Sequence, residues 1–238
     1  MKKISNSAKV AVMQPYFFPY IGYYQLVYAS DIFVFYDDVN YIKGGWINRN
    51  RILINGEPSY FTVSLRGASS NKHIRDIALQ DNRQKLLRSI EVAYGKAPYF
   101  QQAMEPIREV MDGPAKNIAN LAIHSVIAVM NYLGIIREYR VSGDDFAETR
   151  ALDRADRLIA ITKACGARRY INAPGGRELY KKNYFLKNGV ELTFLEPQIE
   201  SYPQANQTYV PGLSIIDVLM FNSPARTIEL IKIAEESC

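Results

Sequence analysis

Cysteine is almost absent from this 238-residue chain, and the two copies, Cys165 and Cys238, are too few for a disulfide framework or a cysteine-rich metal cluster. The chain also has only two histidines, and no spacing of His, Cys or carboxylate residues matches a metal-binding motif. Runs of Lys or Arg long enough for a nucleic-acid-binding arm are missing. These absences predict a protein without a metal site, without a tightly bound cofactor and without a nucleic-acid partner.

Long apolar segments are missing as well. The longest candidate, around residues 121–130, is too short to span a bilayer and carries His124. The chain begins Met1-Lys2-Lys3, but the short apolar run that follows ends at Gln14-Pro15, which makes a poor signal peptide. We therefore expect a cytoplasmic protein that does not insert into a membrane.

Tyrosine, by contrast, is abundant: 17 tyrosines accompany 10 phenylalanines. Tyrosine has an apolar body and a polar tip, so most of these residues are expected at core edges, and the others suit pockets for sugars or bases. The formal net charge of +5 fits an anionic small molecule such as a nucleotide-linked sugar, without requiring one. The hydrophobic fraction of 48% is ordinary for a globular protein.

The first part of the chain predicts a βαβ unit. Residues 10–13 and 32–36 are β-rich runs, and residues 20–29 between them have a helical composition. Pro19 is well placed as the first residue of this helix. Such a unit forms a parallel strand pair with a right-handed crossover.

The rest of the chain predicts further alternation of helices and strands. A tight turn at Asn55-Gly56 joins two strand-like runs. The expected strands are 51–54, 59–65, 137–141, 168–172 and 190–195; the expected helices are 82–95, 98–112, 116–133 (ending at Gly134), 152–165 (ending at Gly166), 176–187 and 225–236.

No internal repeat or linker divides the chain, so we predict one α/β domain over residues 1–238. Its fold class is a Rossmann-like parallel sheet core with a β-hairpin and additional helices. The predicted parts are a Rossmann-like start at 9–54, a helical middle at 82–134 and an α/β end at 137–236.

The densest cluster of aromatic and polar residues lies between Gln14 and Arg51. Its first turn follows a predicted parallel strand, and open α/β sheets bind ligands beyond the carboxyl ends of such strands. Asp37 and Asp38 end the second strand and are expected to face the same crevice. Arg49 and Arg51 offer bidentate donors for phosphate or carboxylate groups. The alternative is that the aspartates cap a turn and the arginines alternate along a solvated strand.

A polar stripe crosses the predicted helix 116–133. Asn117, Asn120, His124 and Asn131 share one face of a helix that is otherwise apolar nearly all round. Buried polar groups need hydrogen-bond partners, so this stripe either forms a network or lines a pocket. His124 is accordingly either a general base or a satisfied core histidine.

A third candidate region follows the predicted strand 168–172. Asn172 ends this strand, and Pro174-Gly175-Gly176 follows it as the start of a predicted helix. Backbone N–H groups at such a helix start can hold an anion. Asn172 is therefore a candidate substrate-binding residue.

The run that begins QPYFFPY at Gln14 and ends WINRNR at Arg51 resembles the signature of the WbqC-like family. The resemblance extends over nearly the whole chain through the segments Tyr94 with Ala97-Pro98-Tyr99-Phe100, Ile123-His124-Ser125, Tyr170 to Gly176, and Pro211 with Leu213 to Met220. This resemblance implies a role in the biosynthesis of O-antigen or of another bacterial surface polysaccharide. The reaction it implies is transfer of an acyl or aminoacyl group to a nucleotide-linked amino sugar.

The donor we expect for such a transferase is a thioester, on coenzyme A or on the phosphopantetheine of an acyl carrier protein. The acceptor amine must lose a proton, for which His124 or Asp37 is the candidate base, and Tyr16, Asn48 or backbone amides are candidate donors to the oxyanion. The candidate substrate-binding residues are Gln14, Tyr16, Tyr20, Asp38, Asn48, Arg49, Arg51 and Asn172.

Two other functional hypotheses stay open. The segment Pro19 to Tyr23 is similar to the strand-loop-helix of nucleotidylyltransferases such as pantothenate synthetase, whose pattern is His-x-Gly-His. Here both histidine positions are tyrosine, and a neutral phenol supplies no positive charge to a transferring phosphoryl group. A nucleotidyl- or glycosyltransferase could instead hold a divalent cation on Asp37 and Asp38. The last alternative is a non-catalytic sugar-binding protein of the same pathway.

Overall fold

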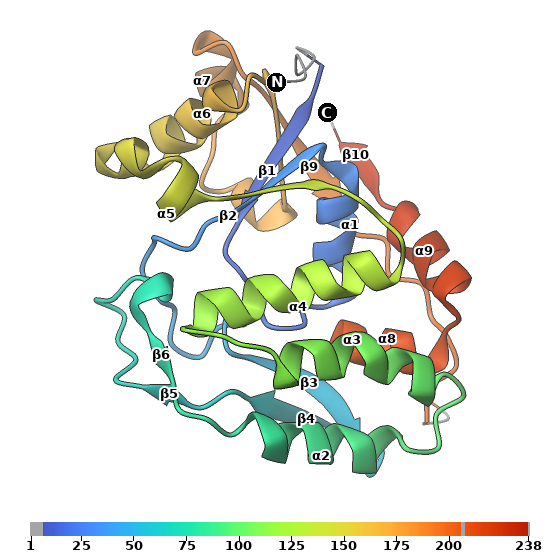
Figure 1. Ribbon diagram of the computed structural model, residues 1–238. Coiled ribbons are helices and arrows are strands. Elements are labelled where there is room, and N and C mark those ends of the chain that lie inside the picture. The colour runs from blue at the N-terminus through green and yellow to red at the C-terminus, as the bar shows by residue number, and fades with distance from the viewer. Residues whose placement is uncertain (1–6, 206–207, 238) are drawn as a thin grey trace.

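The computed structural model describes residues 7–205 and 208–237, and its centre is a six-stranded sheet in the order β10-β9-β8-β1-β2-β7 (Figure 1). Neighbouring strands from β9 to β7 pair in parallel, and β10 pairs antiparallel with β9. The strands are β1 (Lys9–Met13), β2 (Ile32–Phe35), β7 (Glu138–Val141), β8 (Arg169–Asn172), β9 (Glu191–Glu196) and β10 (Glu235–Ser237). The predicted Rossmann-like parallel core is therefore confirmed.

The direction of the strand order reverses beside β1. The chain passes from β1 to β2 and then β7 on one side, and afterwards places β8 and β9 on the other side of β1. The connections that leave β1 and β8 therefore run in opposite directions. We call the carboxyl ends of β1 and β8 the switch point, because open α/β sheets bind ligands where this reversal occurs.

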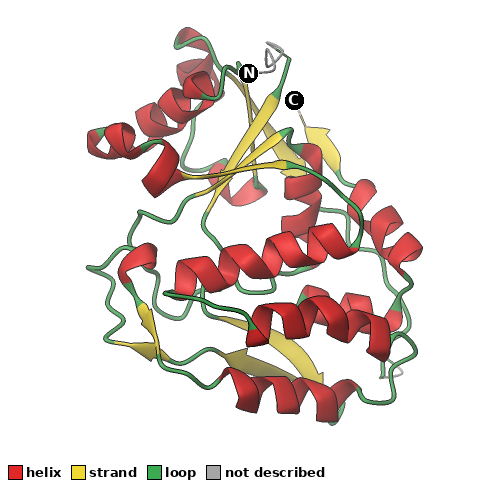
Figure 2. Cartoon of the chain, viewed as in Figure 1, coloured by secondary structure: helices red, strands yellow, loops and turns green. Residues whose placement is uncertain are grey.

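Helices cover both faces of the sheet (Figure 2). Alternate side chains of a strand face opposite sides, so Ala11 is buried on one face while Val10 and Val12 are buried on the other. The Ala11 face packs against α1 (Ile21–Ala29), α4 (Ile118–Tyr132) and α9 (Pro224–Lys232). The Val10 face packs against α6 (Arg154–Ala164) and α7 (Lys182–Lys187).

A hairpin and three helices extend the core on the α4 side, below the sheet in Figure 1. They are β3 (Arg49–Ile54) paired antiparallel with β4 (Glu57–Thr62), α2 (Arg83–Tyr94), α3 (Phe100–Asp112) and α8 (Ile215–Phe221). Buried residues of these elements belong to the same hydrophobic cluster as the Ala11 face of the sheet. The predicted hairpin turn is confirmed, since Asn55 and Gly56 have φ angles of 53° and 80°.

Short elements connect these larger ones. They are β5 (Leu65–Arg66), β6 (Ala78–Leu79), α5 (Ser142–Asp145) and the 3₁₀ helices η1 (Ile74–Asp76), η2 (Ala147–Ala151) and η3 (Pro174–Gly176). The strand expected over 59–65 ends at Thr62, because Leu65 pairs with Leu79 of β6 instead.

Two helix predictions are wrong in their extent. The helix expected over 176–187 begins only at Lys182, after the extended residue Lys181. Gly175 and Gly176 are poor helix formers, and both belong to η3 instead. The helix expected over 225–236 ends at Lys232, because residues Glu235–Ser237 pair with β9. Pairing in the sheet overrides the local helical preference.

The longest helix in the described ranges is α4, with 15 residues. Its Asn117 side chain caps the first turn by accepting from the Asn120 N–H at 2.8 Å. No helix within residues 7–205 and 208–237 has the length and apolar character needed to cross a membrane.

Candidate functional site

The loop Gln14–Pro19, which follows β1, has an unusual and firmly held backbone. Phe18 adopts a φ of 39°, a left-handed value that costs energy for any residue with a side chain. Its N–H donates to Oγ of Ser125 at 2.9 Å, and its carbonyl accepts from Nδ2 of Asn50 at 2.9 Å and from Oγ of Ser214 at 2.7 Å. Three distant segments thus hold a strained turn at the switch point, and strain of this kind often accompanies a functional site.

Tyr20 lies at the end of this loop, with its ring packed against Gly22. A Cβ atom on Gly22 would lie 2.4 Å from Cε2 of Tyr20 and 2.9 Å from Cβ of Pro197. Glycine at this position therefore allows the ring to pack between α1 and the segment after β9. Burial raises the pKa of Tyr20, and burial together with the neighbouring Tyr20 raises the pKa of Tyr16. Both phenols consequently stay neutral near pH 7 and can donate hydrogen bonds.

Asn172 ends β8, the strand beside β1, and is only 6% exposed. Its Oδ1 accepts from the N–H of Ala173 at 2.9 Å, but its Nδ2 makes no hydrogen bond to any residue that the structure describes. A Cβ atom on Gly176 would lie 2.2 Å from this Nδ2, so glycine makes room for the amide. This Nδ2 keeps contact with solvent, so it is available to donate a hydrogen bond to an acceptor on a ligand. Gln14, half-buried, follows the adjacent strand β1.

Asp38 lies at the carboxyl end of β2 and has three partners. Its Oδ2 accepts from Nη2 of Arg157 at 2.6 Å and from Nε of Arg150 at 3.0 Å. Its Oδ1 accepts from Oγ of Ser142 at 2.5 Å. Burial alone would raise the pKa of Asp38, but these hydrogen bonds hold it below the ordinary value.

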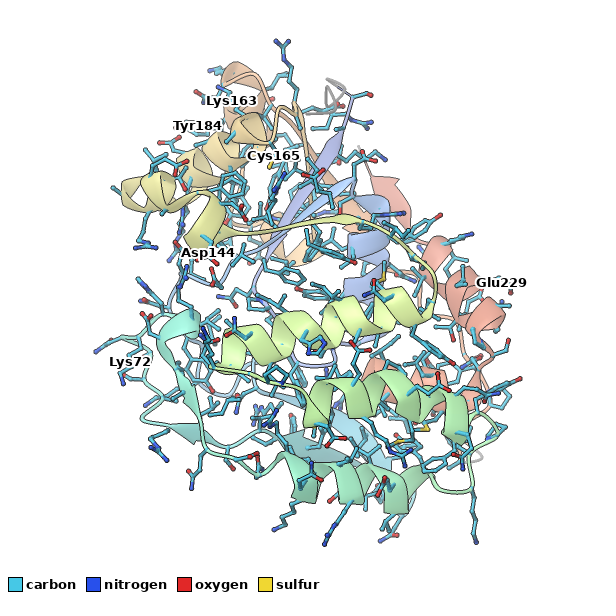
Figure 3. All side chains as sticks on the ribbon, in the orientation of Figure 1. Lys72, Asp144, Lys163, Cys165, Tyr184 and Glu229 are labelled. Atoms are coloured by element: carbon cyan, nitrogen blue, oxygen red, sulfur yellow. The ribbon has the colours of Figure 1, made fainter. Side chains whose placement is uncertain are left out.

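Asp37, its neighbour, is also buried and accepts from the N–H of Gly143 at 2.9 Å. Nη1 of Arg75 lies 3.7 Å from its Oδ2, and Nη2 of Arg75 donates to Asp144, labelled in Figure 3, at 2.5 Å. Burial raises the pKa of Asp37, although the Gly143 N–H and Arg75 act in the opposite direction. A Cβ on Gly143 would lie 1.5 Å from Nη1 of Arg75, so the pairing depends on this glycine.

We call Asp37, Asp38 and their four polar partners, Ser142, Arg75, Arg150 and Arg157, the aspartate cluster. The cluster joins the end of β2 to α5, η1, η2 and α6. A cation bound by the two carboxylates would have to displace guanidinium groups. Within the described ranges, no group of three or more His, Cys, Asp or Glu side chains is arranged to hold a metal ion.

Arg49 and Arg51, both on β3, donate to backbone carbonyls. Nε of Arg49 donates to the Gly45 carbonyl at 3.1 Å and its Nη2 donates to the Gly44 carbonyl. Nη2 of Arg51 donates to the carbonyl of Gly212 at 3.3 Å. In this structure both guanidinium groups therefore hold loops of the chain itself.

The other two candidates also have partners inside the chain. Asn48 is buried, accepts from the hydroxyl of Tyr41 at 2.8 Å and donates to the carbonyl of Val63 at 2.8 Å. His124 has a side chain that is 32% exposed, and its Nε2 lies 3.0 Å from Oε1 of Glu109 on α3. No hydrogen bond in the described chain connects the His124 side chain with another candidate residue.

The structure thus brings some candidates together and separates others. Gln14 follows β1, Asn172 ends the neighbouring strand β8, and Asp37 and Asp38 follow β2 on the other side of β1. Tyr16 and Tyr20, in the loop after β1 and at its end, are neighbours. Sequence reasoning missed Arg75, Arg150 and Arg157, because nothing in their spacing connects them with residues 37 and 38. Ser142-Gly143 could have been found, since it directly follows a predicted parallel strand.

A surface groove of about 550 Å³ lies elsewhere, between the β3–β4 turn and α2. Its lining includes Asn55, Lys85 and Arg88, and contains none of the candidate residues. The groove therefore plays no part in the candidate site.

Comparison with known proteins supplies a family match. The model of the WbqC-like protein family matches residues 14–229, a range that contains every candidate residue. A relative in Mycobacterium tuberculosis, named uncharacterized protein Rv1507c, is 26% identical over 231 residues, which cover 94% of this chain and 97% of the relative. No solved structure matches the chain significantly.

Proposed function

The chain belongs to the WbqC-like protein family, and we propose that it is a transferase that passes an acyl or aminoacyl group to the amine of a nucleotide-linked amino sugar. Family membership indicates a role in polysaccharide biosynthesis. The observation that carries the proposal is the unpartnered amide of Asn172 at the switch point, the place where open α/β sheets bind nucleotides.

In this proposal the nucleotide-linked sugar lies across the carboxyl ends of β1 and β8. The Nδ2 of Asn172 donates to a phosphate or hydroxyl oxygen of the substrate, which supplies the missing acceptor. Tyr16 and Tyr20 add neutral phenol donors from the loop after β1, and Gln14 adds an amide. The firmly held Phe18 turn fixes the position of this loop.

The chemical step joins the sugar amine to a thioester carbonyl, on coenzyme A or on a carrier-protein phosphopantetheine. The C–N bond forms, the C–S bond breaks, and the thiolate leaves and takes up a proton. Asp37 and His124 are the two candidate bases for the proton of the amine. Tyr16 is our preferred donor to the oxyanion, because both polar groups of the Asn48 amide are occupied.

A second candidate, metal-dependent nucleotidyl or glycosyl transfer, is favoured by one observation: two adjacent carboxylates, Asp37 and Asp38, follow a parallel strand. It requires a cation in place of Arg150 and Arg157 on Asp38. The two functions respond differently to EDTA, which leaves acyl transfer intact and abolishes metal-dependent phosphate chemistry.

The binding part is tested by calorimetry with uridine- and thymidine-diphosphate amino sugars. Asn172→Ala should weaken binding roughly tenfold, the effect of losing one hydrogen bond to a charged group. Gly175→Ala is the matched control in the same loop, since nothing lies within 4 Å of the added Cβ. Unchanged affinity in a folded Asn172→Ala protein would remove Asn172 from the site.

The transfer part is tested by following the acylated sugar by mass spectrometry, with acyl-coenzyme A and acyl-carrier-protein donors. Product formation that resists EDTA supports acyl transfer. Tight nucleotide-sugar binding without turnover from any donor would instead identify a sugar-binding protein of the pathway.

A further inference from the structure

The outer face of the β3–β4 hairpin region carries the only tryptophan of the chain. Trp46 is 39% exposed and Tyr60, on β4, is 54% exposed. Their ring centroids lie 6.2 Å apart, with the ring planes inclined by 33°. Large aromatic rings contribute most when they are buried, so two neighbouring rings left at the surface suggest a contact area for a ligand. We call Trp46 and Tyr60 the aromatic platform.

Contacts within the chain hold Tyr60 and the loop before Trp46 in place. The guanidinium carbon of Arg49 lies 4.4 Å from the Tyr60 ring centroid, a cation–π contact on one face of that ring. The same guanidinium group donates to the carbonyls of Gly44 and Gly45 in the loop that leads to Trp46. A binding surface whose parts are already held in place loses little conformational entropy when it binds.

The platform also adjoins the switch-point loop. The N–H of Phe17 donates to the carbonyl of Trp46 at 3.3 Å. The loop Gln14–Pro19, which contributes Tyr16 to the candidate site, is therefore attached to the backbone of the platform.

We propose that Trp46 and Tyr60 bind saccharide by stacking against the C–H face of a pyranose ring, an inference that rests on the proposed sugar substrate. A pyranose has an apolar face formed by its axial C–H groups and a rim of hydroxyls, and the flat apolar face of an indole or phenol ring matches the former. The saccharide is supplied either by the nucleotide-linked sugar or by a growing glycan.

Two observations favour a sugar over a nucleotide base. Arg49, the cation that contacts Tyr60, already uses two of its three guanidinium nitrogens on the carbonyls of Gly44 and Gly45, which leaves little of this group for the phosphates that accompany a base. Two rings inclined by 33° also cannot both lie flat on one planar base, whereas neighbouring units of a saccharide can incline with them.

The single tryptophan makes a direct test possible, because all indole fluorescence reports on Trp46. The wild-type protein is titrated with methyl glycosides and short oligosaccharides of glucose, galactose, mannose, rhamnose and N-acetylglucosamine, with uridine-diphosphate glucosamine, and with uridine diphosphate alone. A saturable change with glycosides or oligosaccharides assigns the platform to glycan. A change with the nucleotide sugar and not with uridine diphosphate assigns it to the substrate sugar. An equal response to uridine diphosphate alone, or no response to any saccharide, overturns the proposal.

Variants of the two platform residues supply a second test. For the saccharide that responds, Trp46→Ala and Tyr60→Ala should each weaken binding by roughly fivefold to tenfold in calorimetry, with unchanged circular dichroism. Tyr184→Ala is the matched control: this tyrosine of α7, labelled in Figure 3, is 44% exposed and remote in the fold from the hairpin. Equal losses in all three variants would contradict a specific platform. These binding measurements need no turnover. Saccharide binding at the platform can therefore be disproved while acyl transfer is observed, and acyl transfer can be disproved while saccharide binding is observed.

Discussion

The guanidinium group of Arg157 donates to Oδ2 of Asp38 over 2.6 Å, and both side chains are buried. Arg157 also donates to Oγ1 of Thr149 at 3.2 Å and lies 4.7 Å from the centroid of the Tyr36 ring. The two charged residues are 119 positions apart in the chain. Their pairing ties α6 to the end of β2 and shapes the carboxyl edge of the sheet beside the switch point.

Asp38→Asn should destabilise the protein by about 3–5 kcal/mol, because it leaves the Arg157 charge buried without its counter-charge. Urea unfolding measures this loss. Asp144→Asn is the control, since the carboxylate of Asp144 is exposed although it also pairs with an arginine, and it should cost less than about 1 kcal/mol. Similar small effects in both variants would show that the buried pair contributes little.

Asp38 should also make the stability of the protein sensitive to acid. The folded-state pKa of Asp38 is below the ordinary carboxyl value, so its contribution to stability is present above the ordinary value of about 3.9 and is lost as the pH falls through the folded-state pKa. The unfolding free energy of the wild-type protein should therefore decline more steeply than that of Asp38→Asn below about pH 4. Parallel profiles of the two proteins in this range would contradict the lowered pKa.

At Asp217 we expect the unfolding free energy to change with pH in the opposite direction. It is buried on α8, where Tyr94, Tyr202 and Gln204 donate to its carboxylate, yet burial raises its pKa above the ordinary value. The folded state then binds the proton more tightly than the unfolded state, so the unfolding free energy falls as pH rises from about 4 to the folded-state pKa.

Asp217→Asn should remove this decline, and thermal unfolding followed from acid to neutral pH measures it. Asp37, whose pKa is also raised, is present in both proteins, so the difference between the two profiles reports on Asp217 alone. A decline of equal slope in the variant would show that Asp217 is not its source.

Gly22→Ala should destabilise the protein by about 1–3 kcal/mol, because the new Cβ would lie 2.4 Å from the Tyr20 ring. Helix propensity alone predicts a gain of about 1 kcal/mol from this change, so the sign of the result decides between packing and propensity. In a Tyr20→Ala background the substitution should cost less, since the closest contact, with the Tyr20 ring, is gone. Chemical denaturation of the four proteins of this cycle provides the measurement.

His124→Gln should leave the thermal midpoint almost unchanged, because the pair with Glu109 is partly exposed and contributes at most about 1 kcal/mol. With His124 as the base, the single-turnover rate should fall roughly 10²–10⁴-fold at unchanged substrate affinity. Glu109→Gln tests the partner and should reduce the rate less. A near wild-type rate in His124→Gln would leave Asp37 as the candidate base.

Local sequence determined most of the elements, because their signals act over a few residues. Alternating and continuous apolar runs predicted the parallel strands of the core. Pro19, predicted as the first residue of the first helix, instead lies in the loop before it, since α1 begins at Ile21 after the N-cap Tyr20. Asn55-Gly56, Gly134 and Gly166 all have the positive φ angles expected for a turn or for the end of a helix. The Gln14–Arg51 run carried the family signature, and the family match confirmed it.

Tertiary structure decided which groups meet, because such contacts join residues far apart in the chain. Residues 235–237 have a helical composition, yet they pair with β9 at the edge of the sheet. The guanidinium groups of Arg49 and Arg51 donate to backbone carbonyls, although their spacing suits anion binding equally well. Arg157 pairs with Asp38, whereas the Nδ2 of Asn172 donates to no acceptor in the described chain. Whether a polar side chain is satisfied depends on the direction in which distant segments are packed around it, and no local pattern of residues encodes that direction.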